Sequence, residues 1–364
     1  MKFKITKAAF LEGLKRVQNI ISGKGNIAIL QNVKLSAREE GLELVTTDLD
    51  ITVKSTVSCE TTEPGETTLP VKLLVAAISK ADEGIIEVEV DADERAVIKS
   101  GKARYKINGR PASDFPPIAE EEDNFRYTVS KAVMHEMIRK TAYATSQDDT
   151  RRALKGLLFS FKDGKLTMVA TDGRRMAMVE HELEFPPMNE KDIIIPSKAV
   201  AELVRSLDSE GDAVLCVRAS NVCFETENVK IYSKLIDDTY PNYRLVIPRE
   251  TPNVIQVDRQ AFINALERAS VMSIDEARST VLDFSDNVLT VSSGQSEIGE
   301  VKDEVPVKYV GERIEAKFNP AYIMDCLKSI DDDEITLKIS NGHTPVIITC
   351  SVPFLYVLMP LRQK

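Results

Sequence analysis

The sequence predicts an α+β protein made of three copies of one unit. A helix-forming segment recurs at offsets of 124 and 128 residues, and an alternating strand segment recurs at offsets of 124 and 123 residues. Two proline-bearing joints separate the copies at equivalent places. Recurrence at a fixed period indicates one structural unit used several times, and 364 residues exceed a single ordinary domain.

The first helix of each copy is predicted from its start signal and its apolar spacing. Each follows a residue with a good N-cap side chain, and apolar residues then recur at i and i+4 on one face. The caps are Thr6, Ser130 and Asp258, and the apolar pairs are Phe10 with Leu14, Met134 with Ile138, and Phe262 with Leu266. Each copy therefore opens with an amphipathic helix.

A strand and a second helix complete each copy. The strands alternate with period 2, as half-buried strands do, and the second helices follow a proline, which presets φ for the first turn. The strands are centred on Leu42–Leu44, Leu166–Met168 and Leu289–Val291, and the prolines are Pro70, Pro196 and Pro320. In each copy, two amphipathic helices should therefore cover one face of a largely antiparallel sheet.

The joints between the copies set the predicted domain boundaries. They span Pro111–Phe125 and Thr239–Asn253. We predict an N-terminal domain over residues 1–119, a central domain over residues 125–248 and a C-terminal domain over residues 252–364.

Composition predicts a folded cytoplasmic protein. Hydrophobic residues make up 43% of the chain and charged residues 29%, which is typical of globular domains. Apolar runs are too short to span a membrane, and the N-terminus lacks the apolar core of a secretory signal. The five cysteines are scattered without paired spacing, so they are predicted to be reduced packing thiols. We therefore expect no metal and no cofactor.

Three segments imitate functional motifs but are better accounted for by the framework. Gly23–Ala28 fits a loose dinucleotide-binding pattern, but it follows a helix rather than a strand. Gly294–Gly299 is one residue too long for a nucleophile elbow. Asp331–Glu334 is acidic, yet acidic turns also end the second helix of the other two copies. With three histidines and no paired catalytic carboxylates, we predict no catalytic residues and no enzyme activity.

Charge is distributed unevenly along the chain. The net charge is −10, yet the six predicted helices total +7, which leaves −17 for all other residues. Arg16, Lys140 and Arg268 share one repeat position, two residues beyond a buried apolar residue. Two residues turn about 200° around a helix, so these cations should face away from the apolar stripe. A solvated helix face accounts for this feature as well as a surface facing a polyanion does.

Three local motifs accompany the repeats, and they carry a resemblance to a known family. They are TDGRRMA at Thr171–Ala177, YPNY at Tyr240–Tyr243 and VLMPLR at Val357–Arg362. Over its whole length the chain resembles the bacterial sliding clamp, the β subunit of DNA polymerase III. The resemblance implies a ring formed by a head-to-tail homodimer, which encircles double-stranded DNA independently of its sequence and tethers the replicative polymerase.

The resemblance also implies partners that bind through short linear motifs. They include the DNA polymerase III catalytic subunit, the clamp loader, other polymerases and repair proteins. No membrane is expected among the partners. DNA contacts are expected from helix cations and, by resemblance, from two loop residues. The helix cations are Lys7, Arg16, Lys72, Lys80, Lys131, Lys140, Lys198 and Arg205, and the loop residues are Lys24 and Gln147.

The dimer contact is expected between the first domain of one copy and the third domain of the other. By resemblance it involves Tyr105 and Ile107 on an exposed strand edge and Val271 and Met272 at the end of a helix. An apolar strand edge is an association liability unless it is paired. The alternative for these four residues is a place in the core of their own domain.

The strongest site prediction is a peptide pocket at the second joint. Val45–Asp50 matches Val169–Arg174 at an offset of 124, but only the second copy replaces the leucine by Gly173 and adds two arginines, which the framework does not require. Glycine permits close backbone approach, and arginine can hold a peptide's carbonyl or carboxylate groups. Pro360 cannot continue a central strand, so the apolar tail should leave the sheet and cross a surface.

By resemblance, that surface is the pocket into which partners insert their motifs. Its methionine and leucine walls can repack around different side chains. Leu245 stands where some relatives have arginine, and Gln363 and Lys364 extend the usual ending. The predicted lining comprises Leu154, Thr171, Gly173, Arg175, Met176, Pro241, Val246, Val357, Met359, Pro360, Leu361 and Arg362.

Two other classes of protein fit parts of this pattern. A peptide-binding repeat scaffold that never encircles DNA would need no ring closure. An unrecognised hydrolase would need a polar cluster that the sequence does not show. The oligomeric state, together with retention on circular but not on linear DNA, separates these classes.

Overall fold

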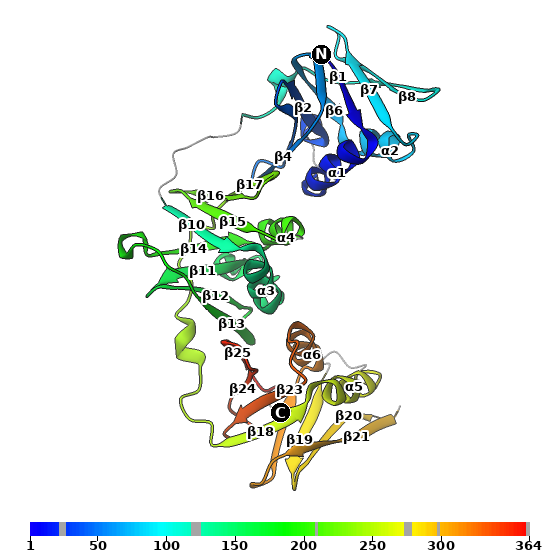
Figure 1. The fold of residues 1–364 in the computed structure, drawn as a ribbon. Coiled ribbons are helices and arrows are strands. Elements are labelled where there is room, and N and C mark those ends of the chain that lie inside the picture. Colours follow the sequence, from blue (N-terminus) through cyan, green and yellow to red (C-terminus); the bar gives the residue numbers. More distant parts are fainter. Residues whose placement is uncertain (22–26, 118–124, 208–209, 273–278, 297–298, 362–364) are drawn as a thin grey trace. The chain divides into compact units, whose positions relative to one another are not determined.

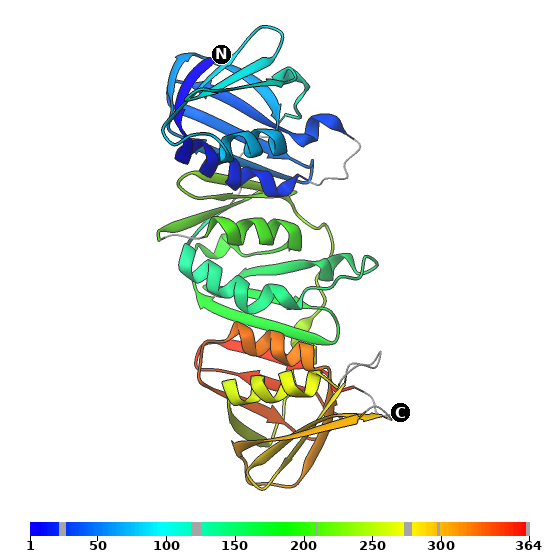
Figure 2. The same ribbon diagram turned by 90° about the vertical axis from the view of Figure 1, so that its right-hand side faces the viewer.

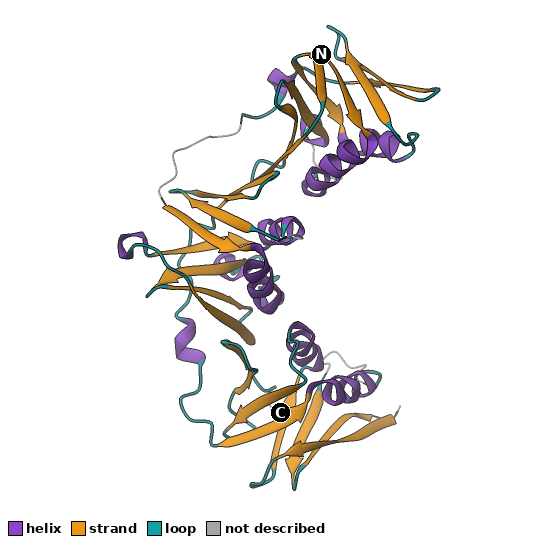
Figure 3. Ribbon diagram, viewed as in Figure 1, coloured by secondary structure: helices purple, strands orange, loops and turns teal. Residues whose placement is uncertain are grey.

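The computed structural model describes residues 1–21, 27–117, 125–207, 210–272, 279–296 and 299–361. In these residues, helices pack on antiparallel sheets (Figure 3). Two compact units are present, and the helices and strands of each carry their labels in Figure 1. Unit 1 contains Met1–Met134 and Lys198–Leu235, and unit 2 contains His135–Ser197 and Ile236–Lys364. The boundary therefore passes through the central repeat rather than between repeats.

Unit 1 contains two sheets, with strand orders β5-β1-β7-β8-β9 and β10-β15-β16-β17-β4-β3-β2-β6. The second sheet passes from the first repeat into the central one, because β4 pairs antiparallel with β17. The strands of the first repeat are β1 Lys2–Thr6, β2 Asn32–Arg38, β3 Gly41–Thr47, β4 Ile51–Val57, β5 Glu60–Glu63, β6 Gly65–Pro70, β7 Ile85–Val90, β8 Arg95–Ser100 and β9 Ala103–Asn108. Those of the central repeat are β10 Phe125–Ser130, β15 Asp212–Val217, β16 Asn221–Glu225 and β17 Val229–Lys234.

Helices α1 (Lys7–Val17) and α2 (Val71–Ser79) lie side by side in unit 1 (Figure 2). The start of α1 is as predicted, because the Thr6 side chain accepts a hydrogen bond from the Ala9 N–H at 3.3 Å. Its apolar face, including Phe10, is fully buried against β3 and β4. The other helical elements with most of their residues in this unit are α4 Ser197–Ser206 and the 3-10 turns η1 Gln18–Ile20, η2 Ala28–Gln31 and η3 Ala112–Asp114.

Unit 2 contains one sheet of twelve strands in the order β14-β11-β12-β13-β25-β24-β23-β18-β21-β20-β19-β22. It passes from the central repeat into the third one where β13 pairs antiparallel with β25. The central strands are β11 Gly156–Lys162, β12 Lys165–Thr171, β13 Arg175–Glu182 and β14 Lys191–Pro196. The third repeat contributes β18 Asn253–Asp258, β19 Thr280–Ser285, β20 Val288–Ser296, β21 Gly299–Lys308, β22 Ile314–Phe318, β23 Glu334–Ile339, β24 Val346–Thr349 and β25 Phe354–Leu358.

Helices α5 (Arg259–Ser270) and α6 (Pro320–Ser329) pack against each other in unit 2. As predicted, Asp258 caps α5 by accepting a hydrogen bond from the Ala261 N–H at 2.7 Å. Asn319 caps α6 in the same way, through the Ala321 N–H at 3.0 Å. The other helical elements are α3 Lys131–Thr141, which begins in unit 1, η4 Ala142–Ala144, η5 Arg152–Lys155, η6 Pro187–Asn189 and η7 Tyr243–Val246.

All three repeats contribute the same pair of four-stranded half-sheets. One half-sheet has the orders β1-β7-β8-β9, β10-β15-β16-β17 and β18-β23-β24-β25 in the three repeats. The other has the orders β6-β2-β3-β4, β14-β11-β12-β13 and β22-β19-β20-β21. Antiparallel sheets with amphipathic helices confirm the predicted α+β class.

The burial of the cysteines and the length of the helices bear on two of the predictions from composition. All five cysteines are free, and Cys216, Cys223 and Cys326 are fully buried. Burial raises the pKa of the Cys223 thiol to about 12, which suppresses the reactive thiolate. Within the described segments, the helices are too short or too polar to cross a bilayer.

Candidate functional site

The residues predicted to line a pocket at the second joint include members of a buried apolar cluster in unit 2, called the floor below. Met176 on β13 lies directly opposite Val357 on β25, and their exposed fractions are 1% and 2%. The floor consists of Ala153, Leu158, Val169, Met176, Ile194 and Val357, and linker residues including Tyr240, Tyr243 and Ile247 pack against it. Leu154 is also buried.

Exposed apolar side chains from the linker and the tail accompany this floor. Val246 is 47% exposed and Met359 is 44% exposed, and Pro241 is exposed as well. β25 ends at Leu358, which confirms that the tail leaves the sheet before Pro360. A mostly apolar site of this kind suits an apolar side chain supplied by a partner.

Two backbone hydrogen bonds hold the tail in place. The Met359 N–H donates to the Arg174 carbonyl at 2.9 Å, and the Leu361 N–H donates to the Lys317 carbonyl at 2.7 Å. Arg362 lies outside the described residues.

A tight polar turn connects β12 to β13 beside the tail. The Asp172 Oδ1 atom accepts hydrogen bonds from the N–H groups of Arg174 and Arg175 at 2.8 and 3.0 Å. The Thr171 hydroxyl accepts from the Gly173 N–H at 3.1 Å and donates to the Arg175 carbonyl at 2.6 Å. These bonds hold the turn that carries the Arg174 carbonyl, and this carbonyl accepts the hydrogen bond from the Met359 N–H of the tail.

The glycine in this turn suits the backbone angle, but the framework does not require it, because the equivalent Leu49 in the first repeat adopts a similar angle. Gly173 has φ +84°, and a Cβ atom there would lie 2.6 Å from the Arg151 guanidinium. The equivalent Leu49 in the first repeat also has a left-handed φ, +78°. Such a conformation suits glycine and strains other residues, so Leu49 is the exception rather than Gly173.

Leu49→Gly should therefore be more stable than Leu49→Ala by about 1 kcal/mol. The left-handed conformation costs an L-residue about 1–2 kcal/mol, and glycine's greater freedom in the unfolded chain offsets part of the gain. Leu49 is 48% exposed, and both variants lose the buried half of its side chain, so their difference reports the backbone conformation. Urea unfolding would measure the change, with Leu49→Ala as the control that keeps the Cβ atom. A midpoint that is no higher for glycine than for alanine would contradict the role assigned to φ.

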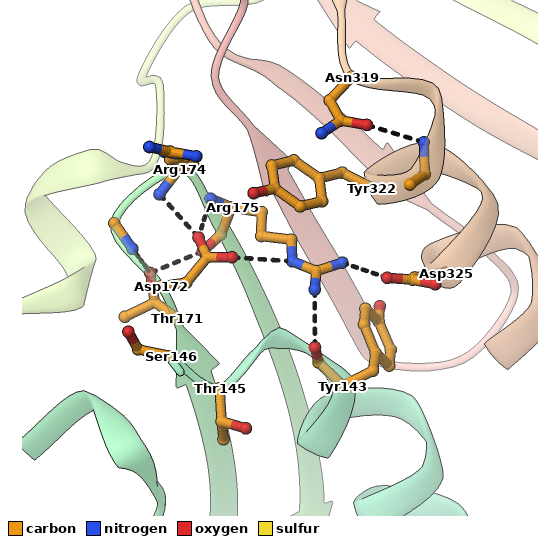
Figure 4. A network of polar contacts seen from close by, with 12 residues as sticks. Tyr143, Thr145, Ser146, Thr171, Asp172, Arg174, Arg175, Asn319, Tyr322 and Asp325 are labelled. Carbon is orange, nitrogen blue, oxygen red and sulfur yellow. Dashed lines mark hydrogen bonds and ion pairs between the residues drawn. The ribbon is translucent and has the colours of Figure 1, made fainter. Parts of the chain in front are cut away.

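Arg175 lies at the centre of a buried polar network (Figure 4). Its Nε donates to Asp172 Oδ2 at 3.1 Å, its Nη1 to Asp325 Oδ2 at 2.6 Å and its Nη2 to the Tyr143 carbonyl at 2.8 Å. The guanidinium also lies 4.3 Å from the centre of the Tyr322 ring. Only 9% of the Arg175 side chain is exposed.

The prediction that Arg175 contacts a partner's peptide stays a prediction, and three of its N–H groups already have acceptors within the chain. Its guanidinium already binds the central and third repeats together, because Tyr143 and Asp172 belong to one and Asp325 to the other. Burial opposes its charge, but the hydrogen bond to Asp325 and the charge of Asp172 keep the pKa of Arg175 above its ordinary value. Arg175 therefore links the central repeat to the third repeat through its hydrogen bonds.

A polar pocket of about 380 Å³ lies on the Tyr322 side of this turn. Its lining includes Gln147, which was predicted by resemblance to touch DNA, and the exposed Arg151 and Arg174. Arg151 also donates to the Asp172 carbonyl at 3.3 Å. Sequence reasoning missed Arg151, Tyr322 and Asp325, because none of them lies in the three motifs that stood out.

The predicted DNA-contacting cations differ in their surroundings. Lys72 and Lys80 are exposed at α2. Four others form ion pairs with acidic neighbours, so much of their charge is balanced locally. These pairs are Lys7 with Glu83, Arg16 with Glu12, Lys198 with Asp48 and Arg205 with Glu202.

Two of the predicted cations do not face outward. Lys131 is 6% exposed, and Lys140 is 2% exposed with its ammonium paired with Glu136. Lys140 also helps to lower the pKa of Asp331, after the hydrogen bond from Arg139. The helical angle alone placed Lys140 in solvent, but neighbouring elements cover that side of α3. Lys24 lies outside the described residues.

The predicted dimer residues also separate into two groups. Strand β9 is the edge of its sheet, as expected, but Ile107 is 3% exposed and belongs to the core of its own repeat. Tyr105 and Met272 are half-buried. Val271, at the end of α5, is 68% exposed.

Three protein-family models together match nearly the whole chain. They are described as the N-terminal, central and C-terminal domains of the DNA polymerase III beta subunit, and they match residues 1–119, 128–242 and 244–362. Among curated proteins, the beta sliding clamps of Caulobacter vibrioides and Vibrio cholerae are 32% and 31% identical to this chain, with 100% of both chains covered in each case.

Solved structures give the same result. The DnaN sliding clamp (DNA polymerase III subunit beta) from Pseudomonas aeruginosa bound to griselimycin matches with a TM-score of 0.96 and 28% identity. The DNA polymerase sliding clamp from Bacillus subtilis matches with a TM-score of 0.95 and 26% identity. Each alignment covers 100% of both chains.

Proposed function

Because this chain belongs to the DNA polymerase III beta subunit family, we propose that two copies close head to tail into a ring around duplex DNA. The chain is a DNA sliding clamp, and the resemblance seen in its sequence is confirmed. The ring, its contacts and its partners are the proposal. We also propose that its role is to tether other proteins rather than to catalyse a reaction.

The observation that carries ring closure is the strand pairing repeated at the two joints. The last strand of one half-sheet pairs with the last strand of the other half-sheet in the following repeat, as β4·β17 and then as β13·β25. The next pair in this series is β21 of the third repeat with β9 of a first repeat. Within one chain, β9 is an edge strand, and residues 299–306 of β21 pair only with β20 among the described strands. Two copies would satisfy both edges.

Charge supports this pairing. Lys99 on β8 lies between Glu87 on β7 and Arg104 on β9, so an acid stands opposite Lys99 on one side only, and Arg104 at the sheet edge has no cross-strand acid opposite it among the described strands. The basic residues of this edge are Arg95, Lys99, Lys102, Arg104 and Lys106, and the acidic residues of β21 are Glu300, Asp303 and Glu304. An acidic strand laid against β9 would relieve the repulsion, and the exposed Val271 would gain a cover.

The proposed DNA contact is weak and independent of sequence. Lys72 and Lys80 are the exposed cations of α2, while Arg16 and Arg205 share their charge with acidic neighbours. Phosphate contacts of this kind position a protein on DNA without reading bases. A topologically closed ring needs no stronger contact, and weak contacts exchange easily as it slides.

The proposed partner site is the pocket at the second joint. Its buried floor and its exposed residues, Val246 and Met359, can receive the apolar side chains of a short linear motif. The partners proposed for it are the DNA polymerase III catalytic subunit, the clamp loader, other polymerases and repair proteins.

Reversing the charge of the β9 edge should convert the dimer to monomers. We expect Arg104→Glu with Lys106→Glu to run as one 40.5 kDa chain by gel filtration with multi-angle light scattering. The control pair Lys191→Glu with Arg249→Glu removes the same charge elsewhere and should stay dimeric. Mixing the monomeric variant with a Glu300→Lys, Glu304→Lys chain should restore a mixed dimer, because both head-to-tail contacts then regain opposite charges.

The functional readout is retention on DNA. Loaded by a clamp loader onto a nicked circular plasmid, the chain and its control pair should be retained and should be released when the plasmid is linearised. The β9 variant should be retained on neither form. Equal retention on circular and linear DNA, or an undisturbed dimer in the β9 variant, would refute the ring.

A further inference from the structure

The first joint contains a second copy of the pocket framework with different chemistry. Lys34, Val45 and Lys54 stand 124 residues before Leu158, Val169 and Met178. The register is the same in both places. Val45 lies opposite Lys34 and Lys54, as Val169 lies opposite Leu158 and Met178. Two apolar positions of the second joint are thus lysines at the first.

A groove of about 730 Å³ lies over these positions in unit 1. Its other side is the linker that follows β9, including Phe115, Pro116 and Pro117. At the second joint, the linker residues Tyr243 and Ile247 pack against the floor in a comparable way. We call this feature the cationic groove and define it by Lys34, Arg38, Lys54, Val45 and Phe115.

The cationic groove has more positive than negative groups. Lys34 and Arg38 share one carboxylate, Glu66, at 3.0 and 3.3 Å, and Lys54 pairs with Glu43. Burial favours the neutral form of Glu66, but the hydrogen bond from Lys34 and the charges of Lys34 and Arg38 hold its pKa below the ordinary value. The carboxylate is therefore ionised at neutral pH, and three cations face two anions.

We propose that the cationic groove is a second docking site, which takes an acidic linear segment of a partner protein. Carboxylates of that segment would bind Lys34 and Arg38 in charge-assisted hydrogen bonds, partly displacing Glu66, and one apolar side chain would lie against Pro116 and Pro117. The chain as a whole has a net charge of −10, so an acidic segment is repelled from most of the surface and drawn to this groove. The inference depends on neither ring closure nor DNA binding.

The two joints would then select different partners. The apolar floor at the second joint offers a carboxylate no partner among its six residues, so an acidic side chain placed there would lose its hydration without compensation. At the first joint, lysines stand at the positions of Leu158 and Met178, so an apolar motif would find no comparable apolar floor there. One repeated framework thereby separates acidic segments from apolar motifs.

The test uses the full chain and a fluorescein-labelled dodecapeptide that alternates glutamate with leucine, followed by fluorescence anisotropy. We expect saturable binding that is lost when lysine replaces glutamate in the peptide. Lys34→Gln with Lys54→Gln should weaken binding by about tenfold or more, since the variant removes one proposed carboxylate contact and a second positive charge of the groove. Arg38→Gln, at a side chain 64% exposed, tests the groove without risk to folding. It should weaken binding about threefold or more.

Two further variants distinguish binding in the groove from binding elsewhere on the chain. Glu66→Gln removes the competing carboxylate and should tighten binding, whereas Lys191→Gln, which changes charge at a distant site in the sequence, should leave it unchanged. Deletion of residues 359–364 should also leave binding unchanged, because the second joint is not involved. No binding, equal binding in all lysine and arginine variants, or loss in the tail deletion would overturn the proposal.

The acidic run Glu120–Asp123, which follows the linker in the sequence, is the alternative ligand that the test must distinguish from a partner. Replacing its four acids by the corresponding amides should change the affinity for the peptide by less than about twofold. Binding that appears only in that variant would assign the groove to this run and overturn the proposal of a partner.

Discussion

Deleting residues 359–364 should lower the affinity for a clamp-binding peptide of the DNA polymerase III catalytic subunit by about a hundredfold or more. The deletion removes Met359, Pro360 and Leu361 from the pocket, and loss of a central apolar contact costs about 2–4 kcal/mol, or one to three powers of ten. The floor residue Val357 and the pairing of β25 with β13 remain, so the dimer and its melting temperature should change little.

A shorter truncation is the matched control. Deletion of residues 362–364 keeps the two backbone hydrogen bonds of Met359 and Leu361 and should retain most of the peptide affinity. Fluorescence anisotropy with the labelled peptide measures both variants. Full affinity after the longer deletion would show that motifs bind elsewhere.

Arg175→Ala should destabilise unit 2 by about 3 kcal/mol, because removing one partner of a buried ion pair leaves the others unsatisfied. Asp172, Asp325 and the Tyr143 carbonyl would all lose their donor. Arg175→Lys should recover only part of the loss, since an ammonium cannot present the forked donors of a guanidinium.

The neighbouring arginine provides the control for this prediction. Arg174 is exposed, and its replacement by alanine should change stability by less than about 0.5 kcal/mol. Urea unfolding followed by circular dichroism gives both values. If the two alanine variants have the same midpoint, Arg175 does not fasten the repeats.

Local features of the fold could be predicted from the sequence because they depend on neighbouring residues. The caps at Thr6 and Asp258 and the break of the sheet before Pro360 are of this kind. The network around Arg175 is not, because Asp325 lies 150 residues away and Tyr143 contributes only a backbone carbonyl.

Side-chain burial was predicted less well than helix position. A helical angle placed Lys140 in solvent, and a strand edge suggested that Ile107 was free, but packing against neighbouring elements buries both. Comparison of the repeats singled out Gly173 for the partner site, which stays a prediction. The glycine also suits the left-handed φ of the turn, and a backbone angle is not visible in one sequence.

The joints have a consequence for how such a chain avoids aggregation. The repeats of the sequence do not coincide with the sheets. Each joint between two repeats lies inside a continuous sheet, where β4 pairs with β17 or β13 pairs with β25. A chain cut between repeats would expose a long row of unpaired N–H and C=O groups, the template on which strands of other molecules add. A joint of this kind can extend an array without limit, and the proposed closure of two chains into a ring would pair the β9 and β21 edges that such an array leaves free.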